Sequence, residues 1–212
     1  MNKKALLVGS SGLIGQKLLE KILASAMYEK VVVLVRTPLD MQHPKLKQYI
    51  VDFKNIELEK NEVDHVFCTI GSTIKKAGSK EEFIRIDKKI PLEIGKICYQ
   101  SGANLYALVT AMGASKDSLI FYNKVKGEVE AELSSIGFEH LGIFRPSMLL
   151  GYRKESRLGE RIGQKFMSLI DFMTPSQYKA IHVEKVADAM LKYAEKPKKG
   201  LSLILSDEML MA

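Results

Sequence analysis

The stretch LLVGSSGLIGQKLL, residues 6–19, decides the fold. Its glycines, Gly9, Gly12 and Gly15, stand three apart between an apolar run and a helix-like apolar rhythm. A glycine turn that joins a strand to a helix is typical of a dinucleotide-binding βαβ unit. There the glycines permit a tight turn, a close approach to a pyrophosphate and close packing of helix on strand. A plain strand–helix turn is the alternative interpretation.

The composition is that of an ordinary globular protein. The chain has 212 residues, of which 46% are hydrophobic and 27% charged, so we expect one domain over residues 1–212. It contains no apolar run near the roughly 20 residues of a membrane helix, and Met1–Lys4 leaves no room for a signal peptide before the first apolar run. Cys68 and Cys98 lack metal-ligand spacing and suit a reducing cytoplasm, which is the location we predict.

The charge pattern limits the choice of partners. The net charge is +7, but the lysines and arginines are scattered, with no basic run or aromatic-interleaved stripe. We therefore expect no specific nucleic-acid partner and no membrane partner. A basic surface also suits an anionic cofactor or substrate. His43, His65 and His140 show no ligand spacing, so no metal site is expected.

Strand-like and helix-like stretches alternate along the chain. Strands are expected at residues 4–8, 31–35, 49–52, 63–70, 104–110, 140–145 and 201–205. Helices are expected at residues 13–25, 80–100, 118–136, 158–172 and 183–194. Such alternation predicts a doubly wound, mostly parallel sheet of about seven strands, with helices on both faces and a small substrate-side region at about residues 146–182. The β-branched run VVVLV at 31–35 should be buried on both faces.

The end of the second expected strand bears on cofactor choice. An acidic residue about 20 positions after the glycine turn usually binds the ribose hydroxyls of NAD. Here Val35-Arg36-Thr37 has none, and the Arg36 guanidinium could pair with a 2′-phosphate. The sequence therefore favours NADP(H) over NAD(H), although a surface arginine at a strand end is the alternative.

Tyr122 and Lys126 form the candidate catalytic pair. They stand at i and i+4 in FYNKVKGEVE, so both side chains lie on one face of the expected helix. An ammonium beside a phenol favours proton exchange by the phenol. The same spacing occurs by chance in many helices, but this pair also follows the fifth expected strand by about a dozen residues, a position that bears on the resemblance described next.

Taken together, these motifs resemble the short-chain dehydrogenase/reductase superfamily. The GxxGxxG spacing, the Tyr122/Lys126 pair, VKGEVE at 125–130 and Phe144-Arg145-Pro146 resemble its extended and atypical branches. Those branches include small Tat-interacting oxidoreductase-like proteins and NAD-dependent epimerase/dehydratase-like proteins. The likeness runs from Lys4 to about Leu191, and it specifies fold and cofactor more narrowly than reaction.

The resemblance implies a set of cofactor-binding residues. The phosphates would lie against the glycine turn, and the adenosine against the ends of the third and fourth strands. The helix before Pro91 would add a residue near the active site, and the step after the sixth strand would border the nicotinamide. The residues concerned are Gly9, Ser10, Ser11, Gly12, Leu13, Ile14, Gly15, Arg36, Asp52, Phe53, Thr69, Ile70, Gly71, Ser72, Asp87, Thr110, Tyr122, Lys126, Arg145, Pro146 and Ser147.

The resemblance also implies the catalytic roles. Tyr122 would exchange the proton, Lys126 would hold the nicotinamide ribose and Thr110 would orient the substrate. Ala111 departs from the pattern, since many relatives have serine there; Ser115 and Ser118 are alternative sources of the hydroxyl. The function expected is NADP(H)-dependent oxidation or reduction of a small carbonyl or alcohol substrate. Two alternatives stay open: a non-catalytic NADPH-sensing regulator with a protein partner, and a nucleoside-diphosphate-sugar epimerase or dehydratase.

Overall fold

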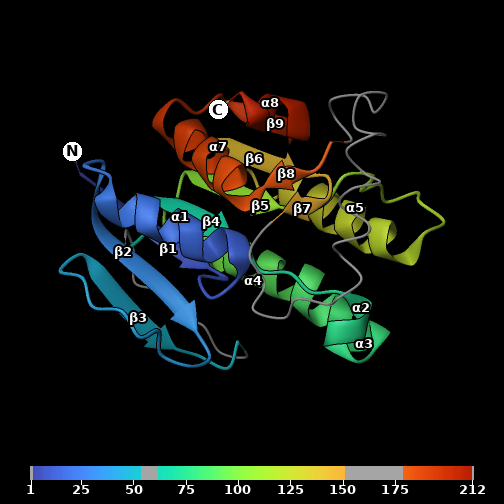
Figure 1. The fold of residues 1–212 in the computed structure, drawn as a ribbon, viewed down its shortest axis with the longest axis horizontal. Coiled ribbons are helices and arrows are strands. Elements are labelled where there is room, and N and C mark those ends of the chain that lie inside the picture. Colours follow the sequence, from blue (N-terminus) through green and yellow to red (C-terminus); the bar gives the residue numbers. More distant parts are fainter. Residues whose placement is uncertain (1, 54–61, 151–178, 212) are drawn as a thin grey trace.

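The predicted α/β fold is confirmed. A computed structural model describes residues 2–53, 62–150 and 179–211. Within them, parallel strands form a seven-stranded sheet in the order β3-β2-β1-β4-β5-β6-β9 (Figure 1). The strands of this sheet are β1 (Lys3–Val8), β2 (Tyr28–Val35), β3 (Leu46–Ile50), β4 (His65–Cys68), β5 (Leu105–Val109), β6 (His140–Arg145) and β9 (Gly200–Leu205). A separate parallel pair joins β7 (Leu149–Leu150) and β8 (Ile181–His182).

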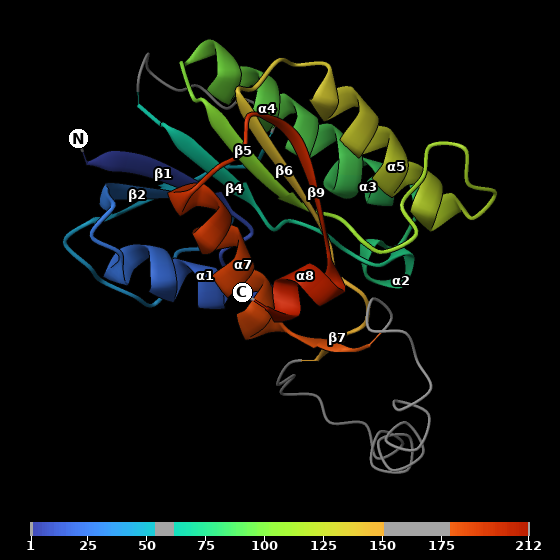
Figure 2. The same cartoon turned by 90° about the horizontal axis from the view of Figure 1, so that it is seen from above.

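Helices cover both faces of the sheet. They are α1 (Leu13–Ala24), α2 (Ile74–Ala77), α3 (Lys80–Ile84), the π-helix η1 (Arg85–Lys89), α4 (Ile90–Gln100), α5 (Phe121–Ser134), α7 (Val183–Glu195) and α8 (Ser206–Leu210). Figure 2 shows α1, α7 and α8 on one face and α3, α4 and α5 on the other. The described residues therefore form two hydrophobic cores, one on each side of the sheet.

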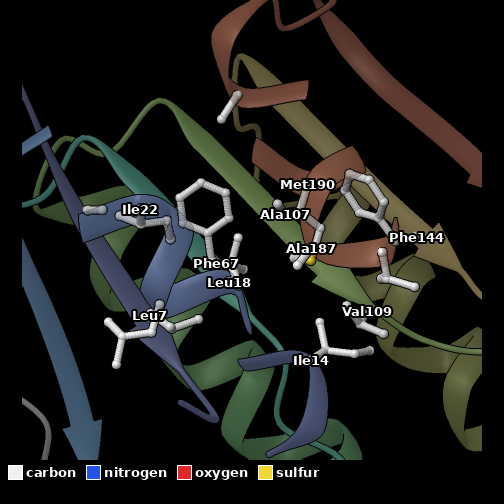
Figure 3. Packing of buried hydrophobic residues seen from close by; sticks show 14 of the residues in the cluster. Leu7, Ile14, Leu18, Ile22, Phe67, Ala107, Val109, Phe144, Ala187 and Met190 are labelled. Atoms are coloured by element: carbon white, nitrogen blue, oxygen red, sulfur yellow. The ribbon is translucent and has the colours of Figure 1, made fainter. Parts of the chain in front are cut away.

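Successive residues of a strand point to opposite faces of the sheet and pack in the two different cores. In the core under α1 and α7, Leu7 and Phe67 from the sheet meet Leu18 of α1 and Met190 of α7 (Figure 3). The run VVVLV at 31–35 is at most 5% exposed at every position, as expected for a strand covered on both faces. Burial of such side chains stabilises the fold by about 1.5–3 kcal/mol each.

The strand order brings the candidate site to one edge of the sheet. From β1 the strand order runs through β2 and β3 to one side and through β4, β5 and β6 to the other, so the topological switch point lies between β1 and β4. Ligands of doubly wound sheets bind beyond the carboxyl ends of the strands at such a point. The glycine turn follows β1, Gly71 follows β4, Thr110 follows β5 and Arg145 ends β6. All four therefore lie at the same edge.

The expected helix at 80–100 is interrupted by a turn of π-helix. It consists of α3, η1 and α4 in sequence, and Pro91 lies in the first turn of α4. The missing N–H of a proline costs least in the first turn of a helix. A π-turn inside a helix often marks a functional site, because it redirects one side chain; here it carries Asp87.

Several boundaries differ from the sequence prediction. The third strand spans Leu46–Ile50 instead of residues 49–52, and Phe53 beyond its end adopts a left-handed φ of 61°. Helix α5 begins at Phe121 and not at Ser118, because the Ser118 hydroxyl accepts a hydrogen bond from Ile120 N (3.1 Å) and holds a turn there. The sequence prediction lacked α2, β7, β8 and α8. The helix expected at 158–172 lies outside the described residues. Among the helices described, none is both long and apolar enough to cross a membrane.

Candidate functional site

The glycine turn tolerates no side chain at two of its positions. Gly9 has φ +88°, and its carbonyl accepts a hydrogen bond from Gly12 N (2.9 Å). A Cβ on Gly15 would lie 2.0 Å from the Gly9 oxygen, and one on Gly9 would lie 2.7 Å from Ile70 N. Helix α1 therefore packs directly on the turn, as the sequence predicted.

The same turn presents unused hydrogen-bond donors. Gly12 is the N-cap of the twelve-residue helix α1, which has neither a side-chain cap nor an acidic residue in its first turn. The first N–H groups of such a helix are available to an anion. Within the described chain, the buried Ser10 hydroxyl has no hydrogen-bond partner. An orphaned hydroxyl beside a bare helix N-terminus fits the phosphates of a dinucleotide.

The Thr69 side chain is hydrogen-bonded to the glycine turn. Its hydroxyl lies 3.0 Å from the Val8 carbonyl oxygen and 3.2 Å from that of Gly9, so it links the ends of β4 and β1. The Thr69 hydroxyl therefore holds the turn in place and donates its hydrogen within the protein.

A hollow of about 480 Å³ lies beyond the end of β3. It is lined by Asp52, Phe53, Arg85, Lys89, Ile90 and Glu93, and so combines the end of β3 with the π-turn and α4. Arg85 is held on Glu82 by two hydrogen bonds of 2.8 and 2.7 Å. These bonds, with a smaller contribution from the charge of Arg36, lower the pKa of Glu82. Asp52 and Phe53, the two residues assigned to the adenine side, line this hollow, and Arg36, at the end of β2, is exposed.

Lys126 of the candidate catalytic pair is anchored by the π-turn. The Lys126 ammonium lies 2.7 Å from Asp87 Oδ1, and both side chains are buried. Asp87 Oδ2 accepts a hydrogen bond from Ser72 N (2.9 Å), which ties the pair to the loop after β4. Burial raises the pKa of the Asp87 carboxyl, while Lys126 and the Ser72 hydrogen bond oppose the rise.

Tyr122 lies on the same face of α5. Its ring packs against Phe83, with ring centroids 5.4 Å apart. Lys126 Nζ lies 5.9 Å from the centre of the Tyr122 ring, within the range of a cation–π contact. A Cβ on Gly71 would lie 3.3 Å from Asp87 Oδ1 and 3.5 Å from Lys126 Nζ, so this glycine borders the ion pair. The structure thus brings the expected Tyr122, Lys126, Asp87 and Gly71 together.

Thr110 is arranged differently from the expectation. Its buried hydroxyl donates a 2.6 Å hydrogen bond to Glu130 Oε1. Arg145 binds the same carboxylate through both Nε (3.0 Å) and Nη2. The Thr110 hydroxyl is therefore committed to a buried network of three side chains, from the ends of β5 and β6 and from α5.

The remaining predicted residues join neighbouring loops. Pro146 O accepts a hydrogen bond from Met112 N (3.0 Å). Ser147 N donates to the Ser206 hydroxyl (2.7 Å), and the Ser147 hydroxyl donates to Lys179 O. The Ser115 hydroxyl accepts a 3.3 Å bond from Asp117 N, and Ser118, as described above, holds the turn before α5.

Sequence reasoning missed Glu130 and Ser206. Glu130 follows Lys126 by four positions, so its place on the buried face of α5 was a usable signal. The short helix that begins at Ser206 has no comparable signature. In the part of the chain that the structure describes, no three acidic, histidine or cysteine side chains are grouped to hold a metal ion.

The strand order and the glycine turn after β1 define a protein with the Rossmann-like fold. Sequence comparison then shows its family. The chain belongs to the family of Protein HTATIP2: it is 32% identical to the rat protein over 218 residues, covering 99% of this chain and 88% of that one. It is also 30% identical over 200 residues to "Protein FMP52, mitochondrial" of Debaryomyces hansenii, covering 91% of this chain and 88% of the relative. No family model matches the chain.

Solved structures share the fold at low identity. MoeE5, in complex with UDP-glucose and NAD, has a TM-score of 0.71 at 16% identity, covering 98% of this chain and 80% of that one. The UDP-N-acetylglucosamine 4-epimerase of Methanobrevibacter ruminantium M1 has a TM-score of 0.72 at 16% identity, covering 96% and 76%. At this identity the likeness establishes the Rossmann fold alone.

Proposed function

We propose that the chain binds NADP(H) along the carboxyl edge of the sheet and uses it to reduce or oxidise a small carbonyl or alcohol substrate. The observation that carries this proposal is the buried Asp87–Lys126 ion pair beside Tyr122, at the same edge as the glycine turn. We take residues 1–212 as one domain, with residues 146–182 on the substrate side. The NAD held by MoeE5 in its complex supports a nicotinamide dinucleotide as the cofactor class.

Different residues of the chain would bind different parts of the cofactor. The N–H groups of the glycine turn and the Ser10 hydroxyl would hold the phosphates. Arg36 would pair with the 2′-phosphate, which is the reason to favour NADP(H). Asp52, Phe53 and residues 69–72 would flank the adenosine. When bound, the nicotinamide supplies or accepts a hydride.

Two side chains of α5 would carry out the proton transfer. The Tyr122 hydroxyl would exchange a proton with the substrate oxygen, and Lys126, held by Asp87, would place its charge beside the phenol and the ribose. Arg145 would support the site without touching the cofactor, because its guanidinium is bound to Glu130. Pro146 and Ser147 would border the nicotinamide through their backbone.

A second candidate function has its own support. Ala111 carries no hydroxyl, and the Thr110 hydroxyl donates its hydrogen to Glu130 in the described structure, so neither is free to donate a hydrogen bond to a substrate oxygen. This favours a regulator that senses NADPH and turns over little. The name of the HTATIP2 family suggests a protein partner for that case.

Turnover separates the two candidates. NADPH consumption with small aldehydes and ketones should fall about 100-fold or more in Tyr122→Phe, whereas NADPH binding should persist. Tyr99→Phe, which alters a tyrosine of α4 that is 44% exposed, is the matched control. Tight binding without consumption of any carbonyl substrate would support the sensor, and epimerisation of UDP-glucose would support the epimerase alternative. A cytoplasmic location stays a prediction to be checked by cell fractionation, because the fungal relatives are named mitochondrial.

A further inference from the structure

The loop before α5 ends in two exposed apolar side chains. Leu119 is 103% exposed and Ile120 is 62% exposed; we name these two residues the apolar tip. The turn that carries them is held by the hydroxyls of Ser115 and Ser118, which accept hydrogen bonds from Asp117 N and Ile120 N. The tip is therefore part of a structured turn.

The base of this loop is fixed to α5. Ser115 N donates to Asn123 O (3.1 Å), and a Cβ on Gly127 would lie 2.1 Å from the Ser115 carbonyl carbon. The loop thus lies directly on the helix at Ser115 and projects beyond it at the tip. Both views show the loop standing out at the end of the molecule where α2 and α3 lie (Figures 1 and 2).

Exposed lysines lie in the loop and on the elements at this end of the molecule. Two of them, Lys116 and Lys124, flank the apolar tip in the sequence, and Lys80 of α3 reaches across to the ring of Phe121, with Nζ 5.2 Å from its centre. We call these three, together with the α2 lysines, the lysine collar: Lys75, Lys76, Lys80, Lys116 and Lys124. Ile74 of α2 adds an apolar side chain that is 37% exposed.

Few acids oppose the collar. Asp117 lies in the loop, and Glu81 and Glu82 lie in the first turn of α3, where Glu82 is paired with Arg85. The five lysines therefore outnumber the acids around the tip.

We propose that the apolar tip and the lysine collar dock on the surface of a bilayer that contains anionic lipid. A protein interface needs about 800 Å² of complementary surface on each partner, which a projecting tip of two residues does not offer. A bilayer instead takes up a few apolar side chains at its interface and attracts nearby lysines to its anionic headgroups. This mode needs no membrane-spanning segment. It departs from the sequence-based expectation of no membrane partner, which was argued from the scatter of the lysines and arginines along the sequence.

Docking would orient the candidate site. Ile120 precedes Tyr122 by two positions, so the first turn of α5 would face the lipid surface. If the proposed function holds, a carbonyl substrate dissolved in the bilayer would reach the site from that side. The docking itself does not depend on the proposed function, and vesicle binding is measured without cofactor or substrate.

A single tryptophan can report insertion directly. The chain contains no tryptophan, so Leu119→Trp gives a fluorescence signal without background. Added to vesicles of phosphatidylcholine with about 30% phosphatidylserine, this variant should shift its emission to the blue. The control Leu201→Trp, on edge strand β9 where Leu201 is 58% exposed, should not shift. Pure phosphatidylcholine vesicles should give a smaller shift, and added salt should reduce binding.

Sedimentation with vesicles measures how much the apolar tip and the lysines each contribute to membrane binding. Leu119→Ser with Ile120→Ser should weaken binding about tenfold or more, and Lys116→Ala or Lys124→Ala about fivefold. Leu201→Ser with Leu203→Ser, a matched pair of exposed leucines, should leave binding unchanged. Since all these side chains are exposed, far-ultraviolet circular dichroism should be the same throughout. Equal binding by the tip and control variants, no vesicle binding by the natural chain, or a dimer that depends on Leu119 would overturn the proposal.

Discussion

The Glu130–Arg145 pair allows a quantitative prediction about stability. The two side chains are joined by two hydrogen bonds and are 9% and 23% exposed, and Thr110 donates a third bond to Glu130. Replacing one partner of a buried ion pair leaves an uncompensated charge and costs about 3–5 kcal/mol. Because Arg145 keeps some contact with water, we expect Arg145→Met to lower the free energy of unfolding by about 3 kcal/mol. For a chain of this size, that corresponds to about 6–12 °C in Tm.

A double-mutant cycle isolates the pair. Arg145→Met, Glu130→Gln and the double variant should give a coupling energy of about 2 kcal/mol in urea denaturation. The chain supplies a matched control, since Arg85 also binds Glu82 through two hydrogen bonds, but with side chains 40% and 38% exposed. Solvent screening should make that coupling clearly smaller than the coupling of the buried pair. A coupling for the buried pair no larger than for the exposed pair would refute the reasoning.

Other predictions concern pH and the glycine turn. Burial, with a contribution from Lys3, lowers the pKa of His65 from 6.5 to about 4, so the unfolded chain binds this proton more tightly. Stability should therefore be full above about pH 6.5 and fall by about 3 kcal/mol as the pH drops to about 4, and His65→Gln should flatten this part of the urea-midpoint profile. Gly15→Ala should lower Tm markedly, because its Cβ would lie 2.0 Å from a backbone oxygen. Gly12→Ala, with its nearest atom at 3.2 Å, should keep most of the stability and weaken NADPH binding. An unchanged Tm in Gly15→Ala would contradict the packing argument.

The fold was predictable because its signals are local. The run 31–35 is apolar at every position, which indicates a strand covered on both faces, and it is buried there. Gly9 and Gly15 indicated a turn with no room for side chains, and the structure has that turn. The π-turn at Arg85–Lys89 was not predictable, because nothing in RIDKK distinguishes it from α-helix.

The site was predictable only where spacing along one element placed its residues. Tyr122 and Lys126 share a helix face by their i, i+4 spacing. The Thr110–Glu130 bond joins residues 20 apart, and its geometry depends on how α5 packs against β5. The lysine collar was likewise hidden, since its members are dispersed from residue 75 to residue 124, on elements that the fold brings to one end of the molecule.

The central claim is that the turn at Gly9–Gly15 holds a nicotinamide dinucleotide with Arg36 on its 2′-phosphate. Fluorescence titration of the natural chain and of Arg36→Ala with NADPH and NADH tests this most directly. We predict that the natural chain binds NADPH about tenfold or more tightly than NADH, and that Arg36→Ala binds the two equally. Equal affinities in the natural chain would contradict the role of Arg36, and no binding of either dinucleotide would contradict the claim as a whole.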